Sequence, residues 1–144
     1  TCTSKARRTY LKRLSGPLLD RIDVHLQVNA VTRSDLAAGP GEASASVADR
    51  VLEVRERSAA RWAPLGHRLN AQVPGAVLRS SPWALEAGDI AVLDQALDTG
   101  SLTLRGYDRI LRLAWTLCDL RGANRPTRED VFTALTLREG HPES

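Results

Sequence analysis

The sequence predicts a mainly α-helical domain preceded by a short α/β segment. From residue 47 onward, apolar residues recur at spacings of three and four, which is typical of amphipathic helices. Before that point, the run DVHLQV at 23–28 alternates polar and apolar residues, which is the pattern of a strand. A chain of 144 residues that is 42% hydrophobic can bury one core. We therefore expect a helical bundle with a single strand in front of it.

The N-terminal segment predicts structure that this chain alone cannot complete. Residues 4–14 predict a helix that Gly16 and Pro17 end, and Pro17 suits the first position of one further turn to residue 22. The strand at 23–28 has no evident partner in the sequence, and a single strand cannot satisfy its own backbone hydrogen bonds. The sequence also contains no methionine. We therefore expect an excised part of a longer protein, with residues 1–46 disordered or in a non-native arrangement.

The order of segments predicts four regions, which are 1–30 with the helix and strand, a linker at 31–46, the helical domain at 47–140 and a tail at 141–144. The linker is rich in Gly, Ala and Ser, a composition typical of flexible segments. We expect the first helix of the bundle over 47–62, with Ser46 as its N-cap and an i,i+4 ion pair between Glu53 and Arg57.

Cap residues predict the other three helices. Ser81 and Pro82 are in the favoured order for a helix start, Gly100 suits its end, and Gly88 is a candidate interruption. Thr103 predicts the N-cap of a helix to about Leu120, which Gly122 ends. Thr127 and Asp130 have the spacing of a capping box for a last helix to about Arg138.

The helix expected over 103–120 has two different sides. Its apolar stripe predicts a buried face made of Leu104, Tyr107, Leu111, Ala114 and Cys118, flanked by Ile110 and Leu117. Arg105, Arg109 and Arg112 share another face, where three guanidinium groups could bind anions. The alternative interpretation is a solvated basic face that Asp108 partly neutralises. Spacing alone leaves both interpretations open.

Arg21, in the run LLDRID, also has two interpretations. It could form a surface ion pair that caps a short turn, or it could be held at the end of an element so that it reaches a phosphate on another molecule. Residues 1–25 hold six Lys or Arg against two acidic residues, so the basic excess is N-terminal. Most of this excess forms one basic cluster, made of Lys5, Arg7, Arg8, Lys12 and Arg13. The cluster could contact nucleic acid, or it could simply be the outer face of a short helix.

Other candidate chemistry is weak. The sequence lacks the P-loop pattern, and its three histidines lack metal-ligand spacing, so we expect no metal site. Cys118 on an apolar face predicts a buried small side chain, and two cysteines make no disulfide framework. We expect the three tryptophans to pack in the core or in a groove. They are Trp62, Trp83 and Trp115. Without a membrane-length apolar run or a signal peptide, we expect a soluble cytoplasmic protein that does not bind membranes.

The run YLKRLSGPLLDRIDVHLQV at 10–28 resembles the signature of Mg-chelatase-like AAA+ ATPases of the ComM type, bacterial proteins linked to competence and DNA branch migration. Similar runs follow in the same order, VADRVLEVRERSAARW, LN, GSLTLRGYDRILRLAWTLCDLRG and DVFTALTLRE, and the resemblance covers most of residues 8–139. It implies that residues 1–28 are the tail of an ATPase core and that residues from 47 onward form its helical lid. Cys2 resembles the last member of a cysteine cluster that would precede this chain.

The resemblance also implies roles for two arginines. Arg21 matches the arginine finger, which would reach the γ-phosphate bound by a neighbouring subunit of a ring, expected to be a hexamer. Arg105 matches the sensor-2 position, with Arg109 as the runner-up for contacting the nucleotide. ATP and Mg would bind the longer parent protein, whose P-loop would lie upstream, and no cofactor is expected in this segment. Expected partners are the upstream core, neighbouring subunits and DNA.

The sequence departs from the family pattern at two positions. Ser58 is found where the family usually has Gln, and Trp115 where it usually has Arg. Because Trp115 is about 80° around the helix from the three arginines at 100° per residue, we expect the change to alter local surface contacts only.

Two functional hypotheses follow from the sequence. In the first, the chain is the lid and subunit-interface part of an ATP-driven DNA motor and is inactive alone. In the second, it is a free-standing helical module that binds nucleic acid or protein, and this predicts salt-sensitive DNA binding. The modest net charge of +3 and the missing strand partner favour the first.

Overall fold

The computed structural model of the chain describes residues 3, 9, 18, 21–26 and 28–139. Its long helices are α4 (Ser44–Trp62), α6 (Ala87–Asp98), α7 (Leu104–Leu120) and α8 (Arg128–Glu139). The shorter elements are α3 (Arg33–Ala37), α5 (Gly75–Leu78) and two 3-10 turns, η1 (Ala63–Leu65) and η2 (Asn70–Gln72). The described part of the chain contains helices and no strand, which confirms the predicted mainly α fold.

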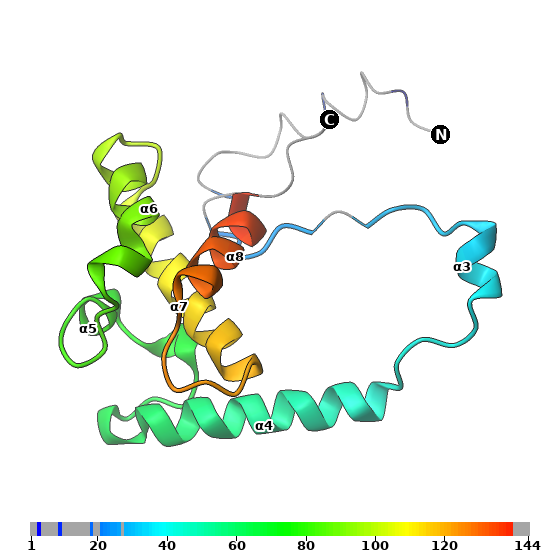
Figure 1. Cartoon of the computed structure of the whole chain (residues 1–144), viewed down its shortest axis with the longest axis horizontal. Helices are drawn as coiled ribbons and strands as arrows, with labels where there is room; N and C mark the ends of the chain where they lie inside the picture. The colour runs from blue at the N-terminus through cyan, green and yellow to red at the C-terminus, as the bar shows by residue number, and fades with distance from the viewer. Residues whose placement is uncertain (1–2, 4–8, 10–17, 19–20, 27, 140–144) are drawn as a thin grey trace.

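Helix α7 is at the centre of the bundle. It contacts α4, α5, α6, α8 and η2, while α6 and α8 also pack on each other. Helix α4 lies across the C-terminal end of α7, and the segment from residue 28 onward passes through α3 and returns to the start of α4 (Figure 1). The bundle therefore depends mainly on the buried face of α7.

The core confirms the predicted role of the three tryptophans. Ring centroids of Trp62 are 4.6 Å from Trp83 and 5.6 Å from Trp115, and the last two are 6.1 Å apart. Such tilted and edge-to-face contacts are favourable for aromatic rings. Trp115 is only 2% exposed, so the expectation that it alters surface contacts is wrong. Its face of α7 turns toward α4, and its ring belongs to the core.

Several predicted caps and pairs are confirmed. The hydroxyl of Thr103 accepts a hydrogen bond of 3.0 Å from the backbone N–H of Gly106, and α7 ends just before Gly122, whose φ is 73°. The backbone N–H of Thr127 donates to Asp130 Oδ2 at 2.8 Å at the start of α8, which is one of the two hydrogen bonds of the predicted capping box. The ion pair between Arg57 and Glu53 is present at 3.8 Å.

The segment before the bundle differs from the prediction in its expected strand. The described residues of the expected strand, 23–26 and 28, form no strand, because no second strand is available to pair with them. The backbone N–H of His25 instead donates to the carbonyl of Leu137 at 2.7 Å, near the end of α8. The helix expected over 4–14 lies outside the described residues except at Thr9.

The expected linker contains a helix of its own. Thr32 and Asp35 form a capping box at the start of α3, because the Thr32 hydroxyl accepts from the Asp35 N–H while the Asp35 carboxylate accepts from the Thr32 N–H. Helix α4 then begins at Ser44, so the prediction of Ser46 as its cap is wrong.

Helix α6 begins later than predicted. Its first residue is Ala87, and residues 81–83 form a turn instead of a helix start. The turn allows Trp83 to pack on Trp62, which outweighs the local preference for a helix after Ser81. Gly88 lies within the first turn of α6 and does not interrupt it.

Candidate anion-binding site

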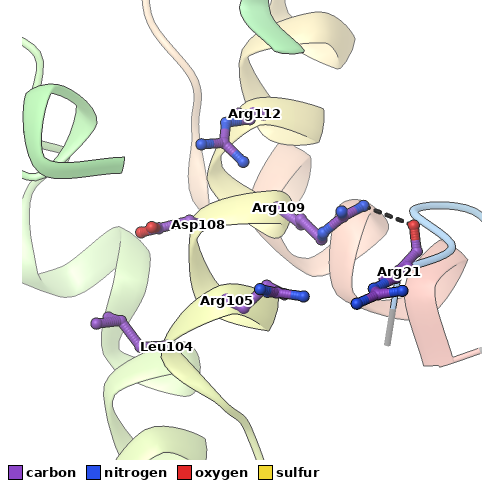
Figure 2. Close-up of a pocket in the computed structure, with 6 residues that line it drawn as sticks. All are labelled: Arg21, Leu104, Arg105, Asp108, Arg109 and Arg112. Atoms are coloured by element: carbon purple, nitrogen blue, oxygen red, sulfur yellow. Dashed lines mark hydrogen bonds between the residues drawn. The ribbon is translucent and has the colours of Figure 1, made fainter. Parts of the chain in front are cut away.

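Arginine side chains surround one pocket beside the N-terminal half of α7. The pocket has a volume of about 660 Å³, and Figure 2 shows the six side chains at its edge. They are Arg21, Leu104, Arg105, Asp108, Arg109 and Arg112. The structure thus brings Arg21 together with the three arginines of α7, although more than 80 residues separate them along the chain.

The opposite side of α7 is buried, as its apolar spacing predicts. Tyr107, Leu111, Ala114 and Cys118 are each at most 4% exposed. Leu104 is the exception, since it is 51% exposed and lies at the edge of the pocket, so its predicted burial is wrong. As the first residue of α7, it extends beyond the part of the helix that the core covers.

The four guanidinium groups differ in their partners. Arg109 Nη1 donates to the carbonyl of Arg21 at 2.8 Å and forms an ion pair with Asp23. Arg112 Nε donates to the carbonyl of Val73 at 2.9 Å. Among the described residues, the exposed side chains of Arg21 and Arg105 have no hydrogen-bond or ion-pair partner. These two cations are therefore available to an external anion.

The carboxylate on α7 beside the arginines has a partner on another element. Asp108 pairs with Arg79, which lies just after α5, and this pair satisfies both groups. Asp108 thus lines the pocket, but its ion pair is with Arg79 and not with an arginine of α7. The pocket retains an excess of positive charge, which favours an anion such as a phosphate.

The pKa of Arg112 shows the effect of placing several arginines close together. Its burial lowers the pKa of its guanidinium, and the positive charge of Arg109 lowers that pKa further. Arginine remains a cation at neutral pH all the same, so the cost of holding two cations together is not relieved by loss of a proton. A bound anion would relieve it.

The other predicted candidates are not part of this pocket. Cys118 is fully buried, which confirms its predicted packing role, and its Sγ donates to the carbonyl of Ala123 at 3.2 Å. His25 and His67 are partly buried, and the described residues contain no group of three His, Cys, Asp or Glu that could hold a metal ion. The basic cluster of Lys5, Arg7, Arg8, Lys12 and Arg13 lies outside the described residues, as do Cys2 and His141.

A second polar cluster, which the sequence did not indicate, lies at the other end of α7. Asp119 is fully buried and pairs with Arg61, whose guanidinium also lies 4.4 Å from the ring of Trp115. Asn70 donates to Asp119 at 2.9 Å and accepts from the indole N–H of Trp62 at 2.7 Å. The side chains of Arg61, Asn70 and Asp119 are hydrogen-bonded to one another, so the cluster joins α4, η2 and α7 as a structural link.

Together, the fold and the pocket define a helical bundle with an arginine-lined pocket beside the start of its central helix. The chain belongs to the family described as magnesium chelatase, subunit ChlI C-terminal, whose model matches residues 41–138. A second model, magnesium chelatase, subunit ChlI, matches residues 1–36. These matches confirm the resemblance to Mg-chelatase-like proteins and support a segment of an AAA+ protein.

The chain is also similar to curated bacterial proteins. It is 41% identical over 138 residues to an uncharacterized protein of Mycobacterium tuberculosis, covering 96% of this chain and 27% of that protein. It is 34% identical over 139 residues to YifB of Escherichia coli (95% and 26%) and 34% identical over 131 residues to competence protein ComM of Haemophilus influenzae (90% and 25%). The chain thus spans about a quarter of the length of these relatives. None of the helices in the described residues has both the length and the apolar character needed to cross a membrane.

Proposed function

We propose that this chain is the lid and subunit-interface segment of a cytoplasmic ring ATPase, in which Arg21 and Arg105 act on the γ-phosphate of ATP. The single observation that carries the proposal is that these two guanidinium groups line one pocket and are both without a partner among the described residues. The match to the magnesium chelatase family supports the proposal. The chain covers about a quarter of the length of its relatives, so the rest of a longer protein could hold the nucleotide-binding core.

Arg21 is the proposed arginine finger. Its side chain is exposed at the edge of the pocket, as a group that contacts another subunit must be. A planar guanidinium placed at the γ-phosphate neutralises the charge that develops on the transferred phosphoryl group. The chain has no P-loop of its own, so the phosphate would be held by a different stretch of polypeptide.

Arg105 is the proposed sensor-2 residue. Its position in the first turn of α7 makes it part of the lid, and its free guanidinium favours it over Arg109, which already contacts Asp23 and the carbonyl of Arg21. Arg105 and Arg21 line the same pocket, so we propose that they contact the same phosphate. A change in that phosphate would then act on α7, and through α7 on the rest of the bundle.

The charges of the pocket fit a triphosphate. Arg21, Arg105 and Arg112 have no carboxylate partner among the described residues, while Asp108 is occupied by Arg79. ATP and Mg would bind the longer protein, with Mg held by groups upstream of this chain. This chain would supply positive charge and orientation to the phosphates.

The proposed substrate of the motor is DNA, and the proposed partners are the upstream core and identical subunits of a hexameric ring. The DNA proposal is supported by the resemblance to ComM-type proteins and by the competence protein among the relatives. Stimulation of ATP turnover by added DNA in the longer protein tests it. Turnover that DNA leaves unchanged would contradict a DNA motor.

The proposed role of Arg21 is tested by substituting it in the longer ATPase. Arg21→Ala is expected to lower kcat by about 10³-fold or more, while ATP binding measured by a fluorescent nucleotide is retained. Arg50→Ala is a matched control, since Arg50 is an exposed arginine of α4 that pairs with Glu42 away from the pocket. Equal kcat values for both variants would contradict the proposal.

A further inference from the structure

Consecutive residues before the linker are held by α7 and α8. The segment from Arg21 to His25 lies against these two helices. Four of its five residues contact the lid through hydrogen bonds or an ion pair, and these contacts follow. They are the bond from Arg109 Nη1 to the carbonyl of Arg21 (2.8 Å), the bond from Arg138 Nη1 to the carbonyl of Ile22 (3.0 Å), the ion pair of Arg109 with Asp23, and the bond from the N–H of His25 to the carbonyl of Leu137 (2.7 Å). We name this set of contacts the α7–α8 clamp.

The clamp orients the backbone of Arg21 and leaves its side chain free. Arg109 binds the Arg21 carbonyl, so the peptide is fixed while the guanidinium stays exposed in the pocket (Figure 2). A single exposed ion pair such as Arg109–Asp23 stabilises a protein by little. Several bonds to neighbouring backbone groups together restrict a short segment far more than one ion pair does, because each reduces the entropy cost of the next.

Gly106 provides the space that one arm of the clamp needs. A Cβ atom at this position would lie 2.7 Å from Leu102 Cδ1 and 3.3 Å from Arg138 Nε. The side chain of Arg138 lies beside Gly106 and donates to the carbonyl of Ile22. A larger residue at this position would press on Leu102 first and on Arg138 less strongly, so the glycine fits the close approach of Arg138 to this turn of α7.

We propose that Arg109 is a positioning residue, which fixes the segment bearing Arg21 to the lid so that the finger and the lid move as one unit. This inference rests on the proposed function of Arg21. Nucleotide-dependent movement of the lid would then carry Arg21 toward or away from the neighbouring subunit. Arg109 thus acts through Arg21 and makes no contact with the nucleotide.

Hydrogen exchange of the His25 amide in the 144-residue chain tests the clamp without ATP. Arg109→Gln is expected to speed this exchange by about tenfold or more, because local opening of the segment becomes easier. Arg109→Lys is expected to restore part of the protection, since both contacts of Arg109 use one nitrogen that an ammonium can replace. Arg50→Gln, on α4, is the control and should leave the exchange unchanged.

A second variant keeps the test valid if Arg109→Gln fails to fold. Asp23→Asn changes an exposed side chain outside the bundle and should also speed His25 exchange, while tryptophan fluorescence reports an intact core. Unchanged His25 exchange in a folded Arg109→Gln or Asp23→Asn variant would overturn the clamp.

Turnover in the longer ATPase tests the functional part. Arg109→Gln is expected to lower kcat by about tenfold or more with KM for ATP changed by less than about twofold, and Arg109→Lys should recover kcat in part. A raised KM with unchanged kcat would assign Arg109 to nucleotide binding and overturn the positioning role. If Arg21→Ala keeps full turnover, the proposed function of Arg21 is wrong. The hydrogen-exchange experiment would still show whether Arg109 holds the segment from Arg21 to His25 against the lid.

Discussion

The fully buried carboxylate of Asp119 is held by the guanidinium of Arg61, with one contact of 3.0 Å from Arg61 Nη1 to Asp119 Oδ2. Arg57 also donates to the backbone carbonyl of Asp119 at 2.7 Å. These bonds join the C-terminal half of α4 to the end of α7, on the side of the bundle away from the arginine pocket. The pair is thus a structural link, and its loss should change stability.

Removal of this carboxylate should be costly. Asp119→Ala leaves the side chains of Arg61 and Asn70 without a main partner in the interior, and a broken buried pair costs about 3–5 kcal/mol. Urea unfolding followed by tryptophan fluorescence measures this loss. The exposed pair of Arg50 with Glu42 provides the control, since Glu42→Ala should cost less than about 1 kcal/mol. Equal losses in the two variants would contradict the account.

Two glycines in different surroundings provide a matched test of packing. A Cβ on Gly75 would lie 1.8 Å from Asp108 Oδ2, so Gly75→Ala must displace Asp108 from its pair with Arg79 and should destabilise the chain by about 1–3 kcal/mol. A Cβ on Gly88 in α6 meets no atom within 4 Å, and Gly88→Ala should be neutral or stabilising by up to about 1 kcal/mol. Thermal unfolding distinguishes the two, and a stabilising Gly75→Ala would show that Asp108 does not occupy this position.

Asp130 should make stability depend on acid pH. Burial alone would raise the pKa of its carboxyl, but hydrogen bonds from Arg121 and Thr127 outweigh burial and hold that pKa below its ordinary value. A lowered folded-state pKa stabilises the fold above the unfolded pKa, and this contribution is lost as pH falls below about 4. Asp130→Asn should therefore be less stable than the unchanged chain at pH 7, with a smaller gap at pH 3. A gap that is constant across this range would contradict the assignment.

Cys118 should be unreactive in the folded chain. Burial raises the pKa of its thiol, the nearby carboxylate of Asp119 raises it further, and the side chain is inaccessible. In a Cys2→Ser variant, labelling by a thiol reagent at pH 8 should be at least about 100-fold slower than in urea-unfolded chain, because reaction requires opening of the core. Similar rates in the two states would show that the thiol is accessible.

Local signals predicted the helices whose ends depend on neighbouring residues. Thr103 marks the start of α7 and Gly122 marks its end, because the geometry of a helix cap depends only on a few residues next to it in the sequence. The start of α6 was missed because Trp83 packs on Trp62, a contact that no local pattern encodes. Residues 23–26 and 28, the described part of the expected strand, form no strand for a related reason, since a strand needs a partner strand for its hydrogen bonds.

The site was predicted in part. The spacing of Arg105, Arg109 and Arg112 placed them on one face of α7, and the pocket confirms that placement. Sequence spacing could not show that Arg21 would join them, or that Arg109 would be occupied by Asp23. In both cases the residues lie close together in the structure but more than 80 positions apart in the sequence.

The central claim is that Arg21 acts on a nucleotide held by another subunit, and mixing two inactive variants of the longer ATPase tests it most directly. One variant carries Arg21→Ala and the other carries a substitution of the P-loop lysine expected upstream. If the finger acts between subunits, rings that contain both variants hold some intact sites, and turnover should reappear on mixing. Turnover that stays absent in rings shown to contain both variants would contradict the claim.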